Sequence, residues 1–404
     1  MNLMNEASSI KNITRKAGFT LSILVFYMLG CFIPVPMVRI TSQAYELMNN
    51  AALGMVSMMS GANLMRISLF SVGLNPLMMA MIIVQLLTLL RLFYFDTLSN
   101  QQVLFVQQSL TLILAIVQSI VVTVGLHLTS NPLTTTAAVL ILTAGSMLVT
   151  WLGTVNMKYG IGGTLVIILF NIISSSLPII QKSVMNLRRV NNGSEMLLAL
   201  VIGSFIFAIF WIAFNHAYYP VKMINTSMSS KTKPIILPIG LNIGGMMTYM
   251  MGMSLLMMPI IIGQRMRGSI FSDPQFNAII DGIMAFLLFY FFAFVQLNPR
   301  EQAKQMRSRG NYILGIRPGK PTQRYLTKKL IFISLAGAIL NAIQITLGLL
   351  GASLFGKYAG FAVIPMNVIM VVMFMLSISD QTKVLFFPGK YEKIMKDENR
   401  EWTI

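Results

Sequence analysis

Apolar runs long enough to cross a lipid bilayer recur along the whole chain, and no other feature constrains its fold as much. Each run has about 18 or more residues, and a helix of that length spans the ~30 Å hydrocarbon layer. The composition agrees, because 55% of the 404 residues are hydrophobic and only 10% are charged, whereas soluble domains carry roughly 25% charged residues. The alternating ~10-residue strands of a membrane barrel are missing. The sequence therefore predicts an all-α polytopic membrane protein.

Ten transmembrane spans are predicted from these runs. Between the first two lies a weaker apolar segment, residues 51–65, which is too short to cross the membrane. We interpret it as a short helix that enters the membrane region and stops, because irregular backbone at that depth is tolerated only inside protein or beside a watery cavity. The predicted spans are 17–37, 67–90, 103–126, 135–155, 164–181, 196–215, 243–262, 276–296, 330–350 and 358–378.

The basic residues lie in the gaps between the apolar runs. Thirty Lys and Arg against 12 Asp and Glu give a net charge of +18, which in a soluble protein would suggest a nucleic-acid partner. Here the charge is interpreted as topological, and no nucleic acid is expected. With the N-terminus in the cytoplasm, 22 of the 30 bases fall on the cytoplasmic side, as the positive-inside rule requires. Both termini are therefore predicted to be cytoplasmic.

The ten spans divide into five and five around the loop 182–195. An odd number of spans in each half forces the halves into opposite orientations, as in the inverted repeats of many transport proteins. This inference rests on counting, since no clear sequence identity links the halves. We expect an N-terminal half at 1–190, a C-terminal half at 191–380 and a cytoplasmic tail at 381–404.

Residues for catalysis do not gather anywhere in the sequence. His127 and His216 stand alone, without the HExxH pair or the neighbouring carboxylate of a metal site, and are interpreted as interfacial or loop histidines. P-loop, GxSxG and CxxC motifs are missing, so we expect no enzyme, no metal and no cofactor. The single cysteine, Cys31, excludes an intrachain disulfide.

The acidic residues are all assigned to loops, tails or span ends, Asp281 among them. Ion-coupled carriers normally keep an ionisable group near the middle of the membrane, where it costs ~2.5–3.5 kcal/mol or more. This argues against an ion-coupled carrier. A passive or backbone-coordinated small-solute transporter stays open, and an integral membrane enzyme ranks last.

Short stretches of distinctive sequence follow one another near the ends of the predicted spans. They are GCFIPVP at 30–36, MSG at 59–61, FSVGLNP at 70–76, IIVQLL at 82–87, YGIGG at 159–163, LPIGLN at 237–242, FVQLNP at 294–299 and GIRPGKPT at 315–322. In this order and at these depths they resemble the SecY family of channels, which move unfolded polypeptides across and into bacterial membranes. The resemblance implies a multi-pass protein of the bacterial cell membrane with a SecY-like fold.

Several departures from the usual SecY pattern resemble the accessory SecY of Gram-positive cocci. The loop 216–242 lacks dense Arg and Lys runs, and the chain has 33 Met. Ala62 stands where the family has a glycine, and Gly163 where its turn has an asparagine. The accessory branch implies a dedicated motor and a narrow set of glycosylated serine-rich adhesins as exported substrates. An ordinary, housekeeping SecY remains the alternative.

The resemblance implies a ring of apolar side chains that closes the pore. Two pairs in the ring have i, i+4 spacing, which presents both side chains on one helix face, and an apolar ring can exclude water from an empty pore. Any of these residues could instead face lipid or a neighbouring helix, and the last could slip to Ile369. The expected ring is Leu74, Met78, Leu169, Ile173, Met250 and Val368.

Two further channel parts are implied by the resemblance. The segment 51–65 would be a plug with Ala51, Gly54, Met58, Ser60 and Gly61, unless it is an immobile external cap. A lateral gate between the second and seventh spans would admit signal peptides to lipid. Methionines suit such a gate because unbranched thioethers repack around differing partners, although ordinary bundle filling explains each Met as well. The expected gate residues are Gln85, Met246, Met253 and Ser254.

The basic loop 297–325 is expected to dock a separate SecA-type ATPase. Pro318, Gly319 and Pro321 predict a fixed, non-helical projection within it, and Arg317 is the strongest candidate among Arg307, Arg309, Arg317 and Lys320. The alternative is topology retention and attraction to anionic lipid, worth ~1 kcal/mol per base, and Lys328 and Lys329 are assigned to it. The other implied partners are a small SecE-like subunit or accessory Sec components, unfolded preproteins, signal peptides and membrane lipids.

Overall fold

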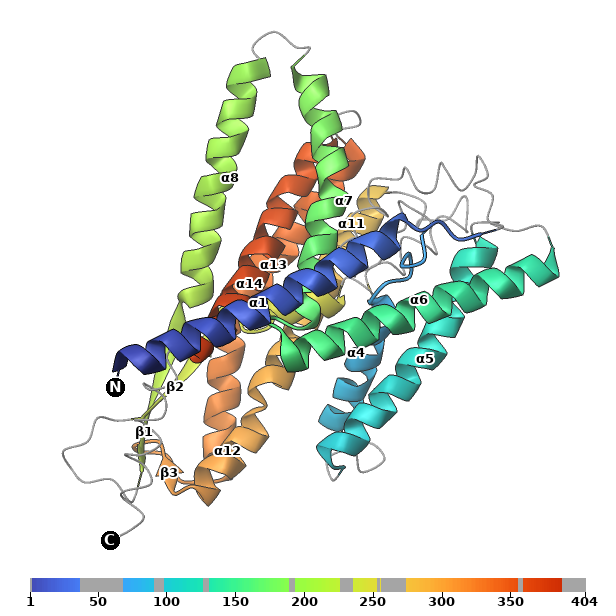
Figure 1. The fold of residues 1–404 in the computed structure, drawn as a ribbon. Helices are drawn as coiled ribbons and strands as arrows, with labels where there is room; N and C mark the ends of the chain where they lie inside the picture. The colour runs from blue at the N-terminus through green and yellow to red at the C-terminus, as the bar shows by residue number, and fades with distance from the viewer. Residues whose placement is uncertain are drawn as a thin grey trace.

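Long α-helices make up most of the protein, because an apolar segment in a bilayer must satisfy its backbone polar groups within itself. The helices lie side by side as a bundle, with a small β-sheet at its lower left end (Figure 1). This confirms the all-α polytopic class. The computed structural model describes residues 2–36, 68–90, 98–125, 131–188, 193–225, 235–252, 255, 274–354 and 359–386.

The elements follow the predicted order along the chain. The first half contains α1 (Asn2–Phe32), α4 (Asn75–Leu90), α5 (Asn100–Gly125), α6 (Pro132–Tyr159) and α7 (Thr164–Leu187). The second half contains α8 (Gly193–His216), β1 (Tyr218–Asn225), β2 (Ile235–Gly240), α9 (Gly245–Met247), the π-helix η2 (Thr248–Gly252), α11 (Pro274–Leu297), α12 (Pro299–Ser308), β3 (Asn311–Tyr312), α13 (Lys320–Leu354) and α14 (Ala359–Phe386).

Seven helices among the described residues are long and apolar enough to cross a membrane. Two shorter apolar helices, α4 and Thr164–Ser174 within α7, coincide with the second and fifth predicted spans. The seventh span, 243–262, is described only as α9, η2 and Leu255. Each predicted span therefore overlaps a helix, while the division into two inverted five-helix halves stays a prediction.

The second span begins later than the sequence predicted. Residues 68–74 form turns, and the helix starts at Asn75 rather than near residue 67. Gly73 has a positive φ of 55°, a conformation that ends regular helix geometry for L-residues, and the proline that follows Asn75 is favoured in a first helical turn. The turn is internally bonded, since the Ser71 hydroxyl accepts from the Ser68 N–H at 2.7 Å.

The main hydrophobic core joins both halves of the chain. It contains buried side chains of α1, α4, α6, α7, α8, η2, α11, α13 and α14. Helix α14 packs against α7 and α1 of the first half and against α8 and α13 of the second. Close approach of helices depends on small residues: a Cβ atom at Gly145 in α6 would overlap the Leu69 carbonyl oxygen, and one at Gly282 in α11 would overlap the Thr346 hydroxyl of α13.

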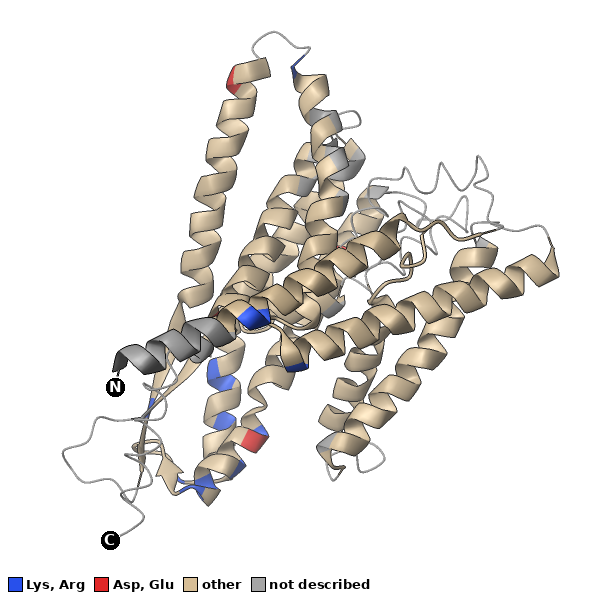
Figure 2. Cartoon of the chain, in the orientation of Figure 1, with Lys and Arg blue, Asp and Glu red and all other residues tan. Residues whose placement is uncertain are grey.

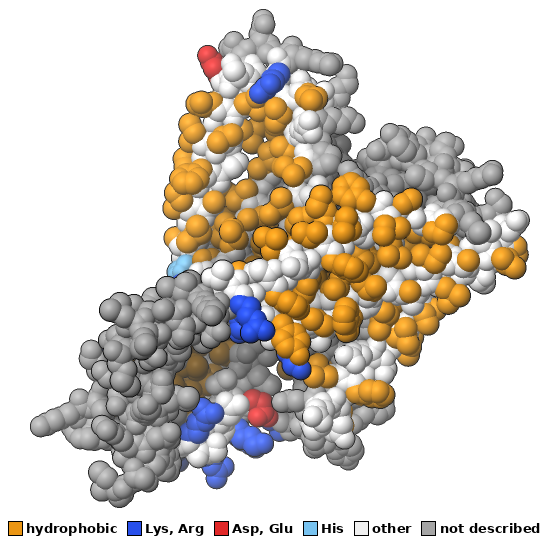
Figure 3. Space-filling view, in the orientation of Figure 1, with side chains coloured by type: hydrophobic (Ala, Val, Ile, Leu, Met, Phe, Trp, Pro, Cys, Tyr) orange, Lys and Arg blue, Asp and Glu red, His pale blue; other side chains and the backbone are white. Residues whose placement is uncertain are grey.

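Apolar side chains cover a broad band of the outer surface (Figure 3). Helix α8 is the extreme case, with Leu198, Val201 and Phe205 all exposed, as expected of a face toward lipid. Figure 2 shows the largest group of Lys and Arg positions around α12 and the start of α13, with further basic positions on α1 and at the end of α6. Arg188 follows the end of α7, and Glu195 lies in the first turn of α8.

Candidate functional site

Five of the six expected ring residues belong to one hydrophobic cluster. Leu74, Met78 and Met250 are buried in the main core, with at most 5% of each side chain exposed. Leu169 of α7 and Val368 of α14 are partly buried against the same cluster. Segments far apart in the sequence thus contribute five apolar side chains to one hydrophobic cluster.

Ile173 is the member that the structure does not bring into this cluster. Its side chain is 45% exposed, whereas that of the neighbouring Ile172 is fully buried in the core. The same shift occurs in α14, where Ile369 is fully buried beside the partly buried Val368. The i, i+4 spacing of Leu169 and Ile173 fixes a shared helix face, but only packing decides how far each side chain is covered.

The helical segment that carries Met250 is irregular. It changes from the short α9 to the π-helix η2. π-Helical turns are rare in proteins, and those that occur are often found at functional sites. Gly244 lies directly before α9, where a Cβ atom would overlap the Phe289 carbonyl oxygen of α11. The Thr248 hydroxyl donates to the Gly244 carbonyl oxygen at 2.8 Å. The segment is therefore pressed closely against α11 at its first turn.

The two helices expected to form a lateral gate are neighbours, because α4 packs against η2. Met246 is partly buried against the main core. Gln85 is partly exposed, while its buried side-chain carbonyl oxygen has no hydrogen-bond partner among the described residues. Met253 and Ser254 lie outside the described residues, as do all five plug residues at 51–61.

The loop between α8 and α9 and the loop between α12 and α13 together form one small sheet of β1, β2 and β3, which we call the platform. Strand β1 pairs antiparallel with β2, and its last residues, Ile224 and Asn225, pair with Tyr312 and Asn311 of β3. The sheet order is β2-β1-β3. Period-2 alternation turns Val221 and Met223 inward and Lys222 outward. A second hydrophobic cluster lies beneath the sheet and includes Met306, Ile313 and Leu326, so the platform is packed onto α11, α12 and α13.

The candidate docking bases project from this platform. The chain between β3 and α13 turns at Gly315 and Gly319, with φ of 78° and 100° and open space where a Cβ would lie, and the Thr322 hydroxyl donates to the Arg317 carbonyl oxygen at 2.9 Å. Residues 313–319 are thus non-helical, as predicted for Pro318 and Gly319, whereas Pro321 lies in the first turn of α13. Arg307, Arg309, Arg317 and Lys320 are exposed and form no ion pair with any described residue.

An asparagine chain inside the second half was not anticipated. The Asn341 amide of α13 donates to the Asn242 side-chain carbonyl at 2.8 Å, and the Asn242 amide donates to that of Asn215 in α8 at 3.0 Å. The chain connects Asn242, three residues before α9, to two long helices. Asn242 ends the LPIGLN stretch, so the sequence marked the position without revealing its partners.

Asp281 corrects the assignment of every acid to loops, tails or span ends. Its side chain is fully buried in the second turn of α11, and both carboxylate oxygens lack a hydrogen-bond partner among the described residues. The sequence suggested a span end because the apolar run begins only a few residues earlier. The described residues include no group of three or more His, Cys, Asp or Glu that could hold a metal.

A membrane-spanning bundle with an apolar centre and a basic platform at one end defines a multi-pass membrane protein of the transport class. The SecY family model matches residues 68–378. The accessory Sec system protein translocase subunit SecY2 of Lactobacillus johnsonii is 41% identical over 97% of this chain and 100% of its own length. The protein translocase subunit SecY of Lactococcus lactis is 30% identical, with 83% and 84% covered.

The fold is shared with solved channels. A structure described as that of a protein-conducting channel aligns with a TM-score of 0.64 and 17% identity over 92% of each chain. The chain belongs to the SecY family. The resemblance to the accessory branch is confirmed, and membership of the family makes the chain a subunit of a protein-translocation channel rather than an enzyme.

Proposed function

We propose that this chain is the central channel subunit of an accessory Sec translocase, driven by a separate SecA-type ATPase. The observation that carries the proposal is the apolar cluster of Leu74, Met78 and Met250, with Leu169 and Val368 against it, at the junction of the two halves. An apolar constriction excludes water and ions when empty and still yields to passing side chains. The plug at 51–65 would seal the pore from the external side.

The ring is tested by ion conductance of the channel in lipid bilayers. Leu74→Asn and Met250→Asn should each raise the resting ion leak severalfold, because an amide hydrates the constriction. Leu198→Asn, at an exposed site on α8, is the matched control and should leave the leak unchanged. Equal leak from all three variants would contradict the ring.

Ile173 needs a test of its own because it is exposed. Ile173→Asn should raise the leak with little change in thermal stability if the side chain borders the pore. Its neighbour Ile172 is fully buried, so Ile172→Asn should lower stability by roughly 2–4 kcal/mol through burial of an unpartnered amide. An Ile173→Asn channel with unchanged conductance would remove Ile173 from the ring.

The lateral gate is proposed to open between α4 and η2. A ~10-residue apolar signal core gains ~3–6 kcal/mol on entering lipid, which is comparable with the contact between one short π-helical segment and α4. Met246, Met253, Gln85 and Ser254 would line the opening. The methionine side chains would adapt to signal peptides of different sequence.

The platform is proposed to dock the motor through Arg317, with Arg307, Arg309 and Lys320 around it. These exposed bases have no ion-pair partner among the described residues and could pair with carboxylates of a partner. A photocrosslinker at position 317, used in inverted membrane vesicles with the cell's SecA-type motors separately tagged, should capture an accessory motor. Capture of only the housekeeping motor would favour a divergent SecY, and capture of neither would contradict motor docking here.

The remaining assignments follow from the same proposal. The accessory branch favours glycosylated serine-rich adhesins as substrates, a small SecE-like subunit or accessory Sec components as stable partners, and the bacterial plasma membrane as the location. Both termini would be cytoplasmic, because the basic platform would then lie on the cytoplasmic side.

A further inference from the structure

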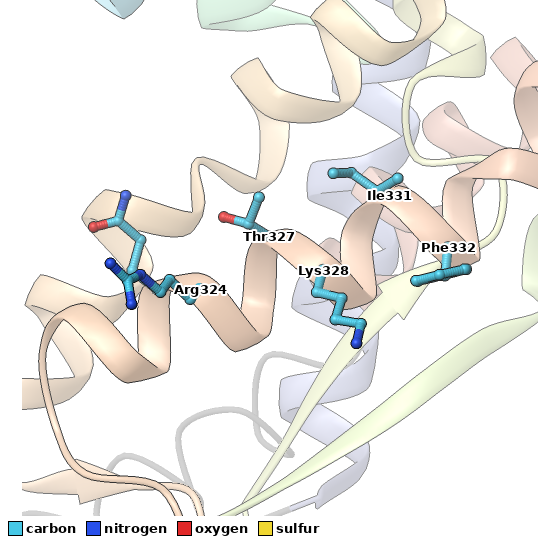
Figure 4. Close-up of a pocket in the computed structure, with 6 residues that line it drawn as sticks. Arg324, Thr327, Lys328, Ile331 and Phe332 are labelled. Carbon is cyan, nitrogen blue, oxygen red and sulfur yellow. The ribbon is translucent and has the colours of Figure 1, made fainter.

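A shallow groove runs along the outer side of the first three turns of α13. Its six lining residues all come from this helix (Figure 4). Gln323, Arg324, Thr327 and Lys328 make the end nearer the platform polar, and Ile331 and Phe332 make the other end apolar. The groove therefore changes from cationic to apolar within a few residues.

The two cations of the groove are available for a ligand. Arg324 and Lys328 are exposed, and neither forms an ion pair or hydrogen bond with a described residue. The adjacent Lys329 differs, because its ammonium donates to the Tyr219 hydroxyl of β1 at 3.3 Å and lies 4.6 Å from the centre of that ring. Among the described residues, Lys329 therefore has an interaction partner, whereas Arg324 and Lys328 have none.

The sequence pattern of α13 indicates that the groove lies near the membrane–water interface. Its 35 residues make α13 about 52 Å long at ~1.5 Å per residue, well beyond the ~30 Å hydrocarbon layer. Beyond Phe332 along α13, an exposed apolar stripe continues through Leu335, Ile339, Ile343 and Leu347. Tyr219 and Lys329 meet at the polar edge of this stripe, and aromatic and basic side chains of this kind are enriched at the membrane–water interface.

We propose that this groove is a binding site for one anionic phospholipid. The phosphodiester would lie between the Arg324 guanidinium and the Lys328 ammonium, with hydrogen bonds from the Thr327 hydroxyl and the Gln323 amide. An acyl chain would follow Ile331, Phe332 and the stripe below them. The apolar end favours a lipid over free phosphate, and the described lining residues include no acid that would pair with a headgroup amine.

This assignment separates the basic residues that would bind lipid from those that would bind a protein partner. Arg324 stands with Lys328 in the lipid groove, although the sequence grouped it with the motor-docking loop. Arg317 and Lys320, on the projecting turn and at its junction with α13, remain free for a protein partner. The inference stands independently of the proposed function, because it rests on one helix and its position at the membrane edge.

The test uses the full chain in nanodiscs with a fluorescent reporter beside the groove. Because Cys31 is the only cysteine, Cys31→Ser with Leu335→Cys, an exposed position next to the groove, allows a single bimane label. Quenching by doxyl-labelled phosphatidylglycerol is compared with quenching by doxyl-labelled phosphatidylcholine. We expect the anionic lipid to be preferred by about thirtyfold at low salt, from two adjacent bases, and the preference to fall at high salt.

Charge-matched variants decide whether the groove itself is responsible. Arg324→Gln with Lys328→Gln should reduce the preference to near unity. Arg300→Gln with Lys304→Gln removes two exposed bases of α12 and should leave it unchanged. Equal loss in both double variants would overturn the site in favour of a diffuse surface charge. Equal quenching by the two lipids, or quenching by neither because a polypeptide covers the groove, would also overturn it.

Discussion

At the scale of single residues, the least expected feature is a carboxylate without a partner inside the bundle. Asp281 is fully buried, and neither of its oxygens accepts a hydrogen bond from a described residue. A buried charge of this kind is expensive unless it is paired. The sequence could show that Asp281 lies near the start of an apolar run, but not that neighbouring helices close over it.

We expect Asp281→Asn to stabilise the protein by about 1–3 kcal/mol, because the amide has the same shape without the charge. Thermal unfolding of the purified protein in detergent measures the change. Asp380→Asn is the control: Asp380 is exposed and pairs with Lys383 at 2.9 Å, so its replacement should change stability by less than about 0.5 kcal/mol. A lower melting temperature for Asp281→Asn would show that the carboxylate is held by a partner.

At the scale of elements, glycine decides how closely the segment before α9 approaches α11. Gly244 has a φ of −84°, which alanine adopts freely, so any effect of a substitution there is steric. A Cβ atom would overlap the Phe289 carbonyl oxygen, which belongs to a rigid helix backbone. The Gly-Gly pair was visible in the sequence, while the element that it meets was not.

Gly244→Ala should therefore destabilise the protein by about 1–3 kcal/mol through overpacking. Gly203 of α8 has no atom within 4 Å of a Cβ position, so Gly203→Ala should be neutral or stabilise by up to about 1 kcal/mol through helix propensity. Unfolding temperatures of the two single variants, measured in the same detergent, give the comparison. Similar effects at both sites would contradict close packing at Gly244.

At the scale of the whole molecule, the basic residues are distributed unequally. Their largest group, which includes Arg309 and Arg317, lies around α12 and the start of α13 (Figure 2), whereas Arg188 and Glu195 lie at the ends of α7 and α8. The positive-inside rule predicts that the platform lies in the cytoplasm. This orientation decides whether the platform can meet a cytoplasmic motor.

Cysteine labelling tests the orientation in a Cys31→Ser background. A membrane-impermeant thiol reagent should label Glu195→Cys in intact cells and should label Arg309→Cys only in inverted vesicles. Glu195 lies in the first turn of α8 and Arg309 directly follows α12, and both residues are exposed. Their accessibility to the reagent therefore depends on the side of the membrane. The reverse pattern would invert the predicted topology and exclude docking of a cytoplasmic motor on the platform.

The membrane class and the approximate place of the spans were predictable from the sequence, because a helix that crosses hydrocarbon needs a long apolar run. The ordered motifs indicated the family. The sequence also marked Leu74, Met78 and Met250, which the structure brings into one cluster. The tertiary fold was needed to show that Ile172 rather than Ile173 is buried, and that β1, β2 and β3 from two separate loops form one sheet. These depend on contacts between distant segments, and a residue's own neighbours in sequence do not encode which partner will cover it.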